Sequence, residues 1–274
     1  MKIVIPMAGL GSRFSKVANT NPEYKKPKPL ILVKGKPMIQ WALESLPFAD
    51  LPHRPAVTSK IVKPENFIFI CRRDHQDEFE IENRLKQIFS NDITVLLIKK
   101  MTRGAAETVL AAKDFIDSEE DIIVSDSDHY FDGSFLYEKI ISKDRDTQGI
   151  IPVFRPPDSE PKWSFSLVEE DDVITAVGEK EKKLAAKGAM ANIGGYYFSH
   201  GNIYVNEVKQ AIREGDLTGD EGKKEFYVAP IYNRLIKKGM KIIAAITPEV
   251  WGLGTPNDVE YFESTYKGLA NASG

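Results

Sequence analysis

The stretch KIVIPM at residues 2–7, followed by AGLGSRF at residues 8–14, decides the fold. The first six residues are mostly apolar and rich in β-branched side chains, which predicts a buried strand. Gly9 and Gly11 end this run. We therefore expect a buried first strand that leads into a glycine-rich turn.

The alternation of strand and helix continues along the first half of the chain. The sequence predicts further strands at 66–70, 93–98 and 121–124, and helices that open at 37–43 or span 74–89 and 105–116. Apolar strands separated by helices favour an α/β fold with a doubly wound, mostly parallel, Rossmann-like sheet. Ligands bind at the carboxyl ends of the strands in such sheets. The turn after Met7, the loop at Arg103 and Gly104, and Asp126-Ser127-Asp128 all fall at such ends.

The pattern changes after about residue 150. Residues 149–154, 164–170, 173–179 and 189–198 read as strands with almost no helix between them, which predicts a mixed or antiparallel C-terminal part. Helices follow at 202–213 and 225–238, then a strand at 240–246 and a last helix from Pro256. Neither half shows a linker that forces a boundary. We expect a single domain, 1–274, with a first part, 1–150, and a second part, 151–274.

The composition excludes several classes of protein. The chain has 274 residues and a formal net charge of −3, so no overall basic field points to nucleic acid, although a local basic patch stays open. No apolar run approaches the ~20 residues that a membrane-spanning helix needs, and the first residues lack the pattern of a signal peptide. Cys71 is the only cysteine, which excludes an internal disulfide and a cysteine-based zinc site. We expect a cytoplasmic globular protein that binds neither membrane nor nucleic acid.

The glycine-rich turn has two readings. Glycines after a buried strand let backbone amides approach a phosphate, and Arg13 adds a forked cationic donor. The dinucleotide fingerprint fails because Phe14 stands where a third glycine is needed, and the Walker A pattern is absent. The plain alternative is a tight turn with a surface arginine.

A long loop at 15–36 holds the next candidate, Lys28. Pro27 and Pro29 stiffen the backbone on either side of it, which suits a lysine that holds a point charge against a phosphate. The alternative is a solvated basic loop. A loop of this length in a compact domain is usually functional or disordered.

Asp126-Ser127-Asp128 is the candidate metal site. Carboxylates two residues apart at a strand end suit Mg²⁺, which prefers one or two carboxylates plus phosphate oxygens. The alternative is an Asp that caps a turn or a helix starting near Ser134. His129 is not expected as a ligand, because Mg²⁺ prefers oxygen, and is expected to shape the pocket.

In this order, the segments resemble the sugar-phosphate nucleotidylyltransferase family. The family pattern runs from a glycine-rich turn ending in Arg, through Pro-Lys-Pro-Leu, a base loop, a metal-binding Asp, Glu-Lys and Asn-x-Gly-x-Tyr, to Gly-Thr-Pro-x-Asp. The matching segments here are Gly9–Arg13, Pro27–Leu30, Gly104–Thr108, Asp126–Asp128, Glu179–Lys180, Asn192–Tyr196 and Gly254–Asp258. Seven motifs in one order span nearly the whole chain.

The resemblance implies a role for each part. The first part would bind the nucleotide and the second the acceptor, and the catalytic residues would be Arg13, Lys28 and Asp128. Asp128, helped by Asp126, would hold the Mg²⁺ cofactor. The nucleotide-binding residues would be Ala8, Gly9, Leu10, Gly11, Ser12, Arg13, Lys28, Arg103 and Gly104, and the acceptor-binding residues Glu179, Lys180, Asn192 and Gly194.

The chain departs from the family pattern at two places. The family often has a second metal-binding Asp two residues before Gly-Thr-Pro, where this chain has Gly252. Metal binding would then depend on Asp126 and Asp128, or on Glu249. The spacing before Thr108 is unusual for the base loop and leaves the role of Glu107 undefined.

The implied reaction couples a nucleoside triphosphate to a sugar phosphate and releases pyrophosphate, giving an activated nucleotide sugar for capsule or lipopolysaccharide synthesis. A related alternative is a cytidylyltransferase that acts on a phosphorylated alcohol such as phosphocholine. Two rivals are a nucleotide-sugar-dependent glycosyltransferase and a non-catalytic regulatory relative. The base and the acceptor stay open, and the family's frequent dimers and tetramers leave a homo-oligomer as an open expectation.

Overall fold

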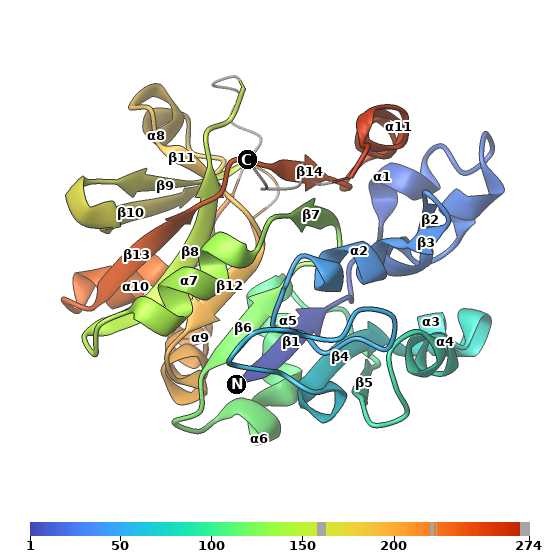
Figure 1. Ribbon diagram of the computed structural model, residues 1–274, viewed down its shortest axis with the longest axis horizontal. Helices are drawn as coiled ribbons and strands as arrows, with labels where there is room; N and C mark the ends of the chain where they lie inside the picture. Colours follow the sequence, from blue (N-terminus) through green and yellow to red (C-terminus); the bar gives the residue numbers. More distant parts are fainter. Residues whose placement is uncertain (158–162, 220–221, 223, 269–274) are drawn as a thin grey trace.

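The computed structural model describes residues 1–157, 163–219, 222 and 224–268. Within these residues, ten strands form one mixed sheet (Figure 1). These strands are β1 (Lys2–Pro6), β4 (Phe67–Arg72), β5 (Thr94–Ile98), β6 (Ile122–Ser125), β8 (Thr147–Phe154), β9 (Ser164–Val168), β10 (Ile174–Glu179), β11 (Met190–Asn192), β12 (Gly195–Phe198) and β13 (Lys241–Ile246). Their order is β10-β9-β11-β8-β12-β6-β1-β4-β5, and β13 pairs with β8 off this path.

The N-terminal half of the sheet is parallel. β1 pairs with β4 on one side and with β6 on the other, and β5 extends the sheet beyond β4. The order β5-β4-β1-β6 is that of a doubly wound sheet, whose direction of winding reverses between β1 and β6. The predicted α/β class and the first four predicted strands are therefore confirmed.

The C-terminal half is mixed, also as predicted. β12 lies antiparallel to both β6 and β8, and β11 lies antiparallel to β8 and β9. β9 and β10 pair antiparallel, while β13 runs parallel to β8. One continuous sheet thus joins the two predicted parts of the chain. Their division into a nucleotide side and an acceptor side stays a prediction.

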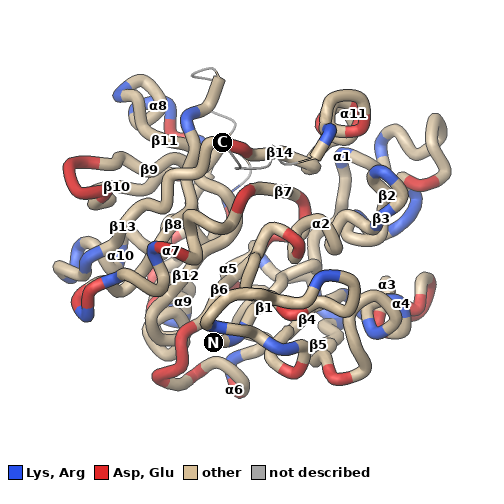
Figure 2. The backbone as a smooth tube through the Cα atoms, viewed as in Figure 1, with Lys and Arg blue, Asp and Glu red and all other residues tan. Residues whose placement is uncertain are grey.

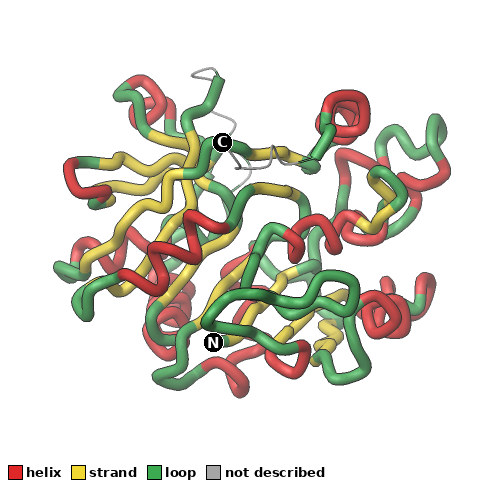
Figure 3. Tube along the Cα trace, in the orientation of Figure 1, coloured by secondary structure: helices red, strands yellow, loops and turns green. Residues whose placement is uncertain are grey.

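Helices lie on both sides of the sheet (Figure 3). They are α1 (Ser12–Ser15), α2 (Met38–Glu44), α3 (Arg73–Phe79), α4 (Ile81–Ile88), α5 (Ala105–Val109), α6 (Lys113–Ile116), α7 (Ser134–Ser142), α8 (Lys182–Ala186), α9 (Gly201–Glu214), α10 (Ile231–Lys237) and α11 (Pro256–Thr265). No helix among the described residues is long and apolar enough to cross a membrane.

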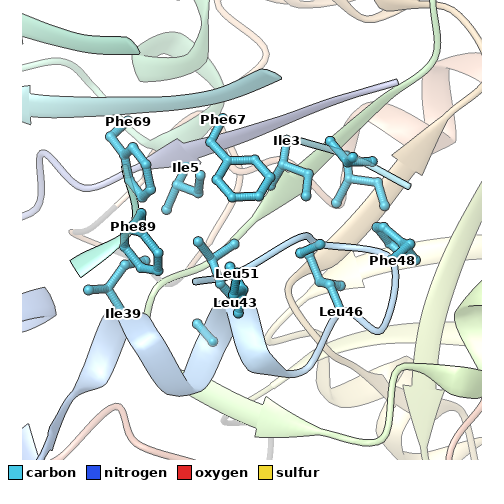
Figure 4. Packing of buried hydrophobic residues seen from close by; sticks show 14 of the residues in the cluster. Ile3, Ile5, Ile39, Leu43, Leu46, Phe48, Leu51, Phe67, Phe69 and Phe89 are labelled. Carbon is cyan, nitrogen blue, oxygen red and sulfur yellow. The ribbon is translucent and has the colours of Figure 1, made fainter. Parts of the chain in front are cut away.

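Alternate residues of the central strands enter different cores. Ile3 and Ile5 of β1, together with Phe69 of β4, pack against α2 and α4 on one face (Figure 4). Val4 and Ile68 point to the other face, where α5, α9 and α10 cover them. A strand buried on both faces reads as a continuous apolar run, which is why residues 2–7 identified it in the sequence.

A third cluster connects the loop after β1 with the C-terminal segment. It contains Phe14, Tyr24, Ile31, Val33, Met38, Trp41, Tyr130, Leu253, Val259 and Phe262. Two small ribbons border it: β2 (Leu32–Val33) pairs with β3 (Lys36–Pro37), and β7 (His129–Phe131) pairs with β14 (Val250–Gly252). The loop predicted at 15–36 is ordered around this cluster and contains short 3₁₀ turns at Pro22–Lys25 and Lys28–Leu30.

Three predicted elements are divided in the structure. The helix predicted at 105–116 becomes α5 and α6, joined by a 3₁₀ turn at Leu110–Ala112. The helix predicted at 74–89 divides at Glu80, whose φ is 50°, into α3 and α4. α3 buries no residue completely, whereas α4 buries Ile81 and Leu85, so the break turns the apolar face of the second segment onto the core. The strand predicted at 189–198 divides into β11 and β12 at Ile193 and Gly194, because its register against β8 shifts there. β11 pairs Asn192 with Val153, whereas β12 pairs Tyr197 with Ile150.

The packing of β4 predicts one stability effect. The Phe69 side chain is fully buried and stacks on Phe89 with ring centroids 5.3 Å apart. Phe69→Ala should therefore lower the free energy of unfolding by about 3–5 kcal/mol, the usual cost of removing a buried aromatic ring. Urea denaturation measures this. The control is Phe115→Ala, because the Phe115 side chain is 42 % exposed. Equal effects of the two variants would contradict the packing described here.

Candidate active site

The carboxyl ends of β1 and β6 bring the predicted phosphate turn and the predicted metal site together. The two strands are parallel neighbours, with Val4 opposite Val124. Their continuations therefore leave the sheet at the same edge. There, the Lys28 ammonium forms an ion pair with the Asp128 carboxylate, with side chains 21 % and 27 % exposed. Figure 2 shows acidic positions beside β7 and basic positions along the segment between α1 and β2.

The glycine-rich turn is exposed to solvent, and it packs on Lys28 and, through Phe14, on the third cluster. Gly11 adopts a φ of 61° and precedes α1, and the Phe14 amide donates to its carbonyl at 2.9 Å. A Cβ on Gly11 would lie 3.6 Å from Lys28 Cβ, so the turn packs directly on Lys28. Phe14 is buried in the third cluster, while Gly9, Leu10, Ser12 and Arg13 are exposed and Ala8 is buried. Phe14, which stands where the dinucleotide fingerprint has its third glycine, therefore anchors the turn in this cluster.

Lys28 is fixed between two buried prolines. Pro27 and Pro29 are both buried, while Lys28 itself is partly exposed toward Asp128. Its neighbour Lys25 is exposed, and Lys26 pairs with Glu23 at 2.5 Å. Among these three lysines, Lys28 is the one that contacts Asp128. Its predicted contact with a phosphate stays a prediction.

Asp126 and Asp128 have opposite electrostatic environments. Burial and the charge of Asp128 raise the pKa of Asp126 to about 7, against the opposing effect of Lys28. Burial alone would also raise the pKa of Asp128, but the Lys28 ammonium outweighs it and the pKa is lowered. One carboxylate is therefore ionised below neutral pH, and the other titrates near neutrality. A second cation would favour ionisation of both.

The helix-cap alternative for this segment does not hold. The carboxylate of Asp132 accepts the Ser134 amide at 3.0 Å at the start of α7. Asp126 and Asp128 are therefore not needed there. The Asp126 amide instead donates to the Gly194 carbonyl at 2.8 Å, which fixes the segment against β12.

The side chains at this edge fit a divalent cation. Asp126, Asp128 and His129 each offer one ligand atom, and these atoms lie within 4.8 Å of one another. His129 Nε2 is buried and has no hydrogen-bond partner among the described residues. Burial lowers the pKa of His129 to about 4, so its imidazole is neutral at pH 7. Glu249, the alternative ligand, lies outside this group and accepts the Trp251 indole N–H at 2.8 Å.

Two glycines make room for the acidic pair. A Cβ on Gly194 would overlap the carboxylate of Asp126. A Cβ on Gly254 would lie 3.3 Å from Asp128 Oδ2 and 3.8 Å from Arg13 Nη1. Arg13, Asp128 and Gly254 therefore meet at one point, although they are far apart in the sequence. The pairing of β7 with β14, which the sequence did not reveal, delivers Gly254 there.

The predicted base loop is tied to a segment that sequence reasoning assigned to a helix. Gly104 has a φ of 141°, and a Cβ there would lie 2.5 Å from the Phe226 carbonyl oxygen. The Phe226 amide donates to the Arg103 carbonyl, and its own carbonyl accepts the Ala106 amide, both at 2.8 Å. The helix predicted at 225–238 therefore begins only at Ile231.

Contacts within the same loop give Glu107 a structural role. Its carboxylate accepts the Arg103 amide at 2.5 Å and the Arg103 guanidinium at 2.7 Å. Arg103 itself lies over the Phe226 ring, 4.9 Å from its centroid. Glu107 thus holds the exposed arginine at the mouth of the loop.

The predicted acceptor residues lie in two settings. Glu179 ends β10 and its charge acts on Asp126. Lys180 follows with a φ of 53°, and its amide donates to the Trp163 carbonyl at 2.9 Å. The Asn192 amide is buried, accepts from Ser166 at 2.7 Å and donates to Ser164 at 3.1 Å. Asn192 therefore uses its side chain inside the sheet.

With this geometry in place, the family of the chain is clear. The family model for nucleotidyl transferases matches residues 2–251, and the chain belongs to this family. A search of curated proteins found no match.

Solved structures share the fold. A nucleoside-diphosphate-sugar pyrophosphorylase from Vibrio cholerae has a TM-score of 0.71 at 24 % identity, covering 96 % of this chain and 100 % of that one. A putative glucose-1-phosphate thymidylyltransferase from Bacillus anthracis has a TM-score of 0.69 at 16 % identity, covering 100 % and 98 %. An inositol-1-phosphate CTP transferase from T. maritima has a TM-score of 0.66 at 14 % identity, covering 98 % and 97 %.

The close approach of Gly194 to Asp126 predicts a second stability effect. Gly194→Ala should lower the free energy of unfolding by about 1–3 kcal/mol, because the added methyl group forces the carboxylate and its segment to move. Chemical denaturation gives this value. Gly252→Ala is the matched control at the same edge, since its Cβ would meet only ordinary contacts at 3.7 and 3.9 Å. If neither variant changed the free energy of unfolding, the close approach of Gly194 to Asp126 would be contradicted.

Proposed function

We propose that the chain is a magnesium-dependent nucleotidylyltransferase that couples a nucleoside triphosphate to a sugar phosphate and releases pyrophosphate. The observation that carries this proposal is the ion pair between Lys28 and Asp128, beside the open glycine turn and Arg13. It assembles two cations and two carboxylates where a polyanion and a metal ion would meet. Such an arrangement suits phosphoryl-group chemistry, which depends on positioning and charge stabilisation.

The nucleotide side follows from the turn. The exposed amides of Gly9, Leu10 and Gly11 would receive the triphosphate, and Arg13 would neutralise its outer phosphates. Lys28 would exchange its contact with Asp128 for the α-phosphate. Asp126 and Asp128 would hold Mg²⁺, which supplies charge neutralisation when bound. Arg103 and Gly104 would border the base.

The chemistry needs no general base. An acceptor phosphate is already ionised near neutral pH, so one of its oxygens attacks the α-phosphorus directly. The bond between the α-phosphorus and the bridging oxygen to the β-phosphate breaks, and pyrophosphate leaves with that oxygen and its electron pair. Arg13 and Lys28 then act by offsetting the repulsion between two polyanions.

The acceptor side is proposed to be the second part of the chain. Glu179 and Lys180 would meet the acceptor, and Gly194 would leave space for it beside Asp126. Asn192 would shape the pocket through its two serine contacts. The Vibrio cholerae protein carries the name of a nucleoside-diphosphate-sugar pyrophosphorylase and the Bacillus anthracis protein that of a putative glucose-1-phosphate thymidylyltransferase, which supports a sugar phosphate as acceptor. A role in surface polysaccharide synthesis is proposed with it. Self-association, common in this family, is also proposed.

Pyrophosphate release tests this function. The enzyme is incubated with Mg²⁺ and each of ATP, GTP, CTP, UTP and dTTP, together with pools of sugar phosphates and of phosphorylated alcohols. Acceptor-dependent pyrophosphate from one triphosphate with the sugar phosphates is the expected result. Activity restricted to CTP and a phosphorylated alcohol would show that the acceptor is a phosphorylated alcohol and not a sugar phosphate. Triphosphate binding without turnover would indicate a non-catalytic relative. Transfer from a preformed nucleotide sugar alone would indicate a glycosyltransferase.

Lys28 gives the sharpest mutational test. Lys28→Ala should lower kcat by about 10²-fold or more, because it removes a charge that acts on the reacting phosphates. Steady-state kinetics with the productive pair measure the loss. Lys25→Ala is the control, since this exposed lysine lies three residues away on the same loop. Near-normal turnover by Lys28→Ala would remove this residue from the mechanism.

A further inference from the structure

The His129 ring packs on Phe131, with centroids 5.4 Å apart, but this contact leaves its hydrogen-bonding groups unexplained. His129 lies on β7, opposite Gly252 of β14, and is only 6 % exposed. Its Nε2 atom is buried without a hydrogen-bond partner in the described part of the chain. Buried polar atoms in proteins are nearly always paired, so an unpaired nitrogen on an imidazole that lies beside two carboxylates calls for a further group.

The surroundings of His129 point to a cation as that group. Its ligand atom and those of Asp126 and Asp128 all lie within 4.8 Å of one another, a spacing that one metal ion can bridge. Gly252, directly opposite in the ribbon, offers no side chain to bind the imidazole. A cation, the ammonium of Lys28, already contacts Asp128. Neutral imidazole and carboxylate together are a common ligand set for divalent transition metals.

We propose that the His129 imidazole is a third ligand of the cation centre, so that the site consists of two carboxylates and one nitrogen. This inference rests on the proposed function only in that the same cation would serve nucleotidyl transfer. A nitrogen ligand favours transition metals over Mg²⁺, which prefers oxygen. The site therefore binds Mn²⁺ more tightly than Mg²⁺, and His129 is the cause of that preference.

Pulsed electron paramagnetic resonance of bound Mn²⁺ tests the ligand directly. Spectra are recorded on the full chain with Mn²⁺ alone and with Mn²⁺ plus triphosphate, and a nitrogen coupling from imidazole is expected. His129→Asn and His129→Gln should lose this coupling and at least about tenfold in Mn²⁺ affinity, since even loss of an outer-shell partner typically costs that much. His53→Asn is the control, because His53 bonds Glu44 and Gln40 away from the site.

The outcomes separate this proposal from the proposed function. Mn²⁺ that binds without nitrogen coupling in both conditions overturns the role of His129, even if pyrophosphate is released with Mg²⁺. No Mn²⁺ binding at all overturns it as well. Nitrogen coupling that disappears in both His129 variants and persists in the control supports the ligand, even if no acceptor gives turnover. Circular dichroism of each variant verifies that the fold is kept.

Discussion

The parallel pairing of β1 with β6 is the constraint on which the site depends. Both strands are buried on both faces, so their register is fixed by two cores at once. Parallel neighbours end at the same edge, which forces the glycine turn and the acidic segment together. The third cluster then holds the loop after β1 and the C-terminal segment above that edge. Neither the pairing of β1 with β6 nor the third cluster supplies a candidate catalytic residue, but together they set where Lys28, Asp128 and Gly254 meet.

The sheet edge at the carboxyl ends of β1 and β6 gathers charged side chains that the packing of the fold does not require. Burial, and then the charge of Asp128, raise the pKa of Asp126. A single lysine offsets part of the repulsion between the two carboxylates, and a buried imidazole adds an unpaired nitrogen. Such an arrangement costs stability in the free protein, and the cations and phosphates of the proposed reaction would relieve it. This electrostatic repulsion between buried groups is therefore what marks the edge as a candidate site.

Local features were predicted well where one residue type carries the signal. The prolines around Lys28 predicted its fixed backbone, and Pro256 predicted the start of α11, which the structure shows capped by the Thr255 side chain. The helix at 225–238 was predicted wrongly at its start, because Phe226 bonds to Arg103 and Ala106 across the chain. Periodicity cannot report such a partner. The break at Glu80 likewise follows from which face of α4 meets the core.

The sequence by itself determined the α/β class and the alternation of strand and helix in the parallel half, and it singled out the candidate site residues, because apolar runs, glycines and prolines act locally. Only the tertiary structure decided which of these residues touch. It joined Gly254 to Asp128 and Arg13, tied Glu107 to Arg103, and buried His129 beside the acidic pair. These contacts depend on long-range pairing and shared burial, which no single segment of the chain encodes.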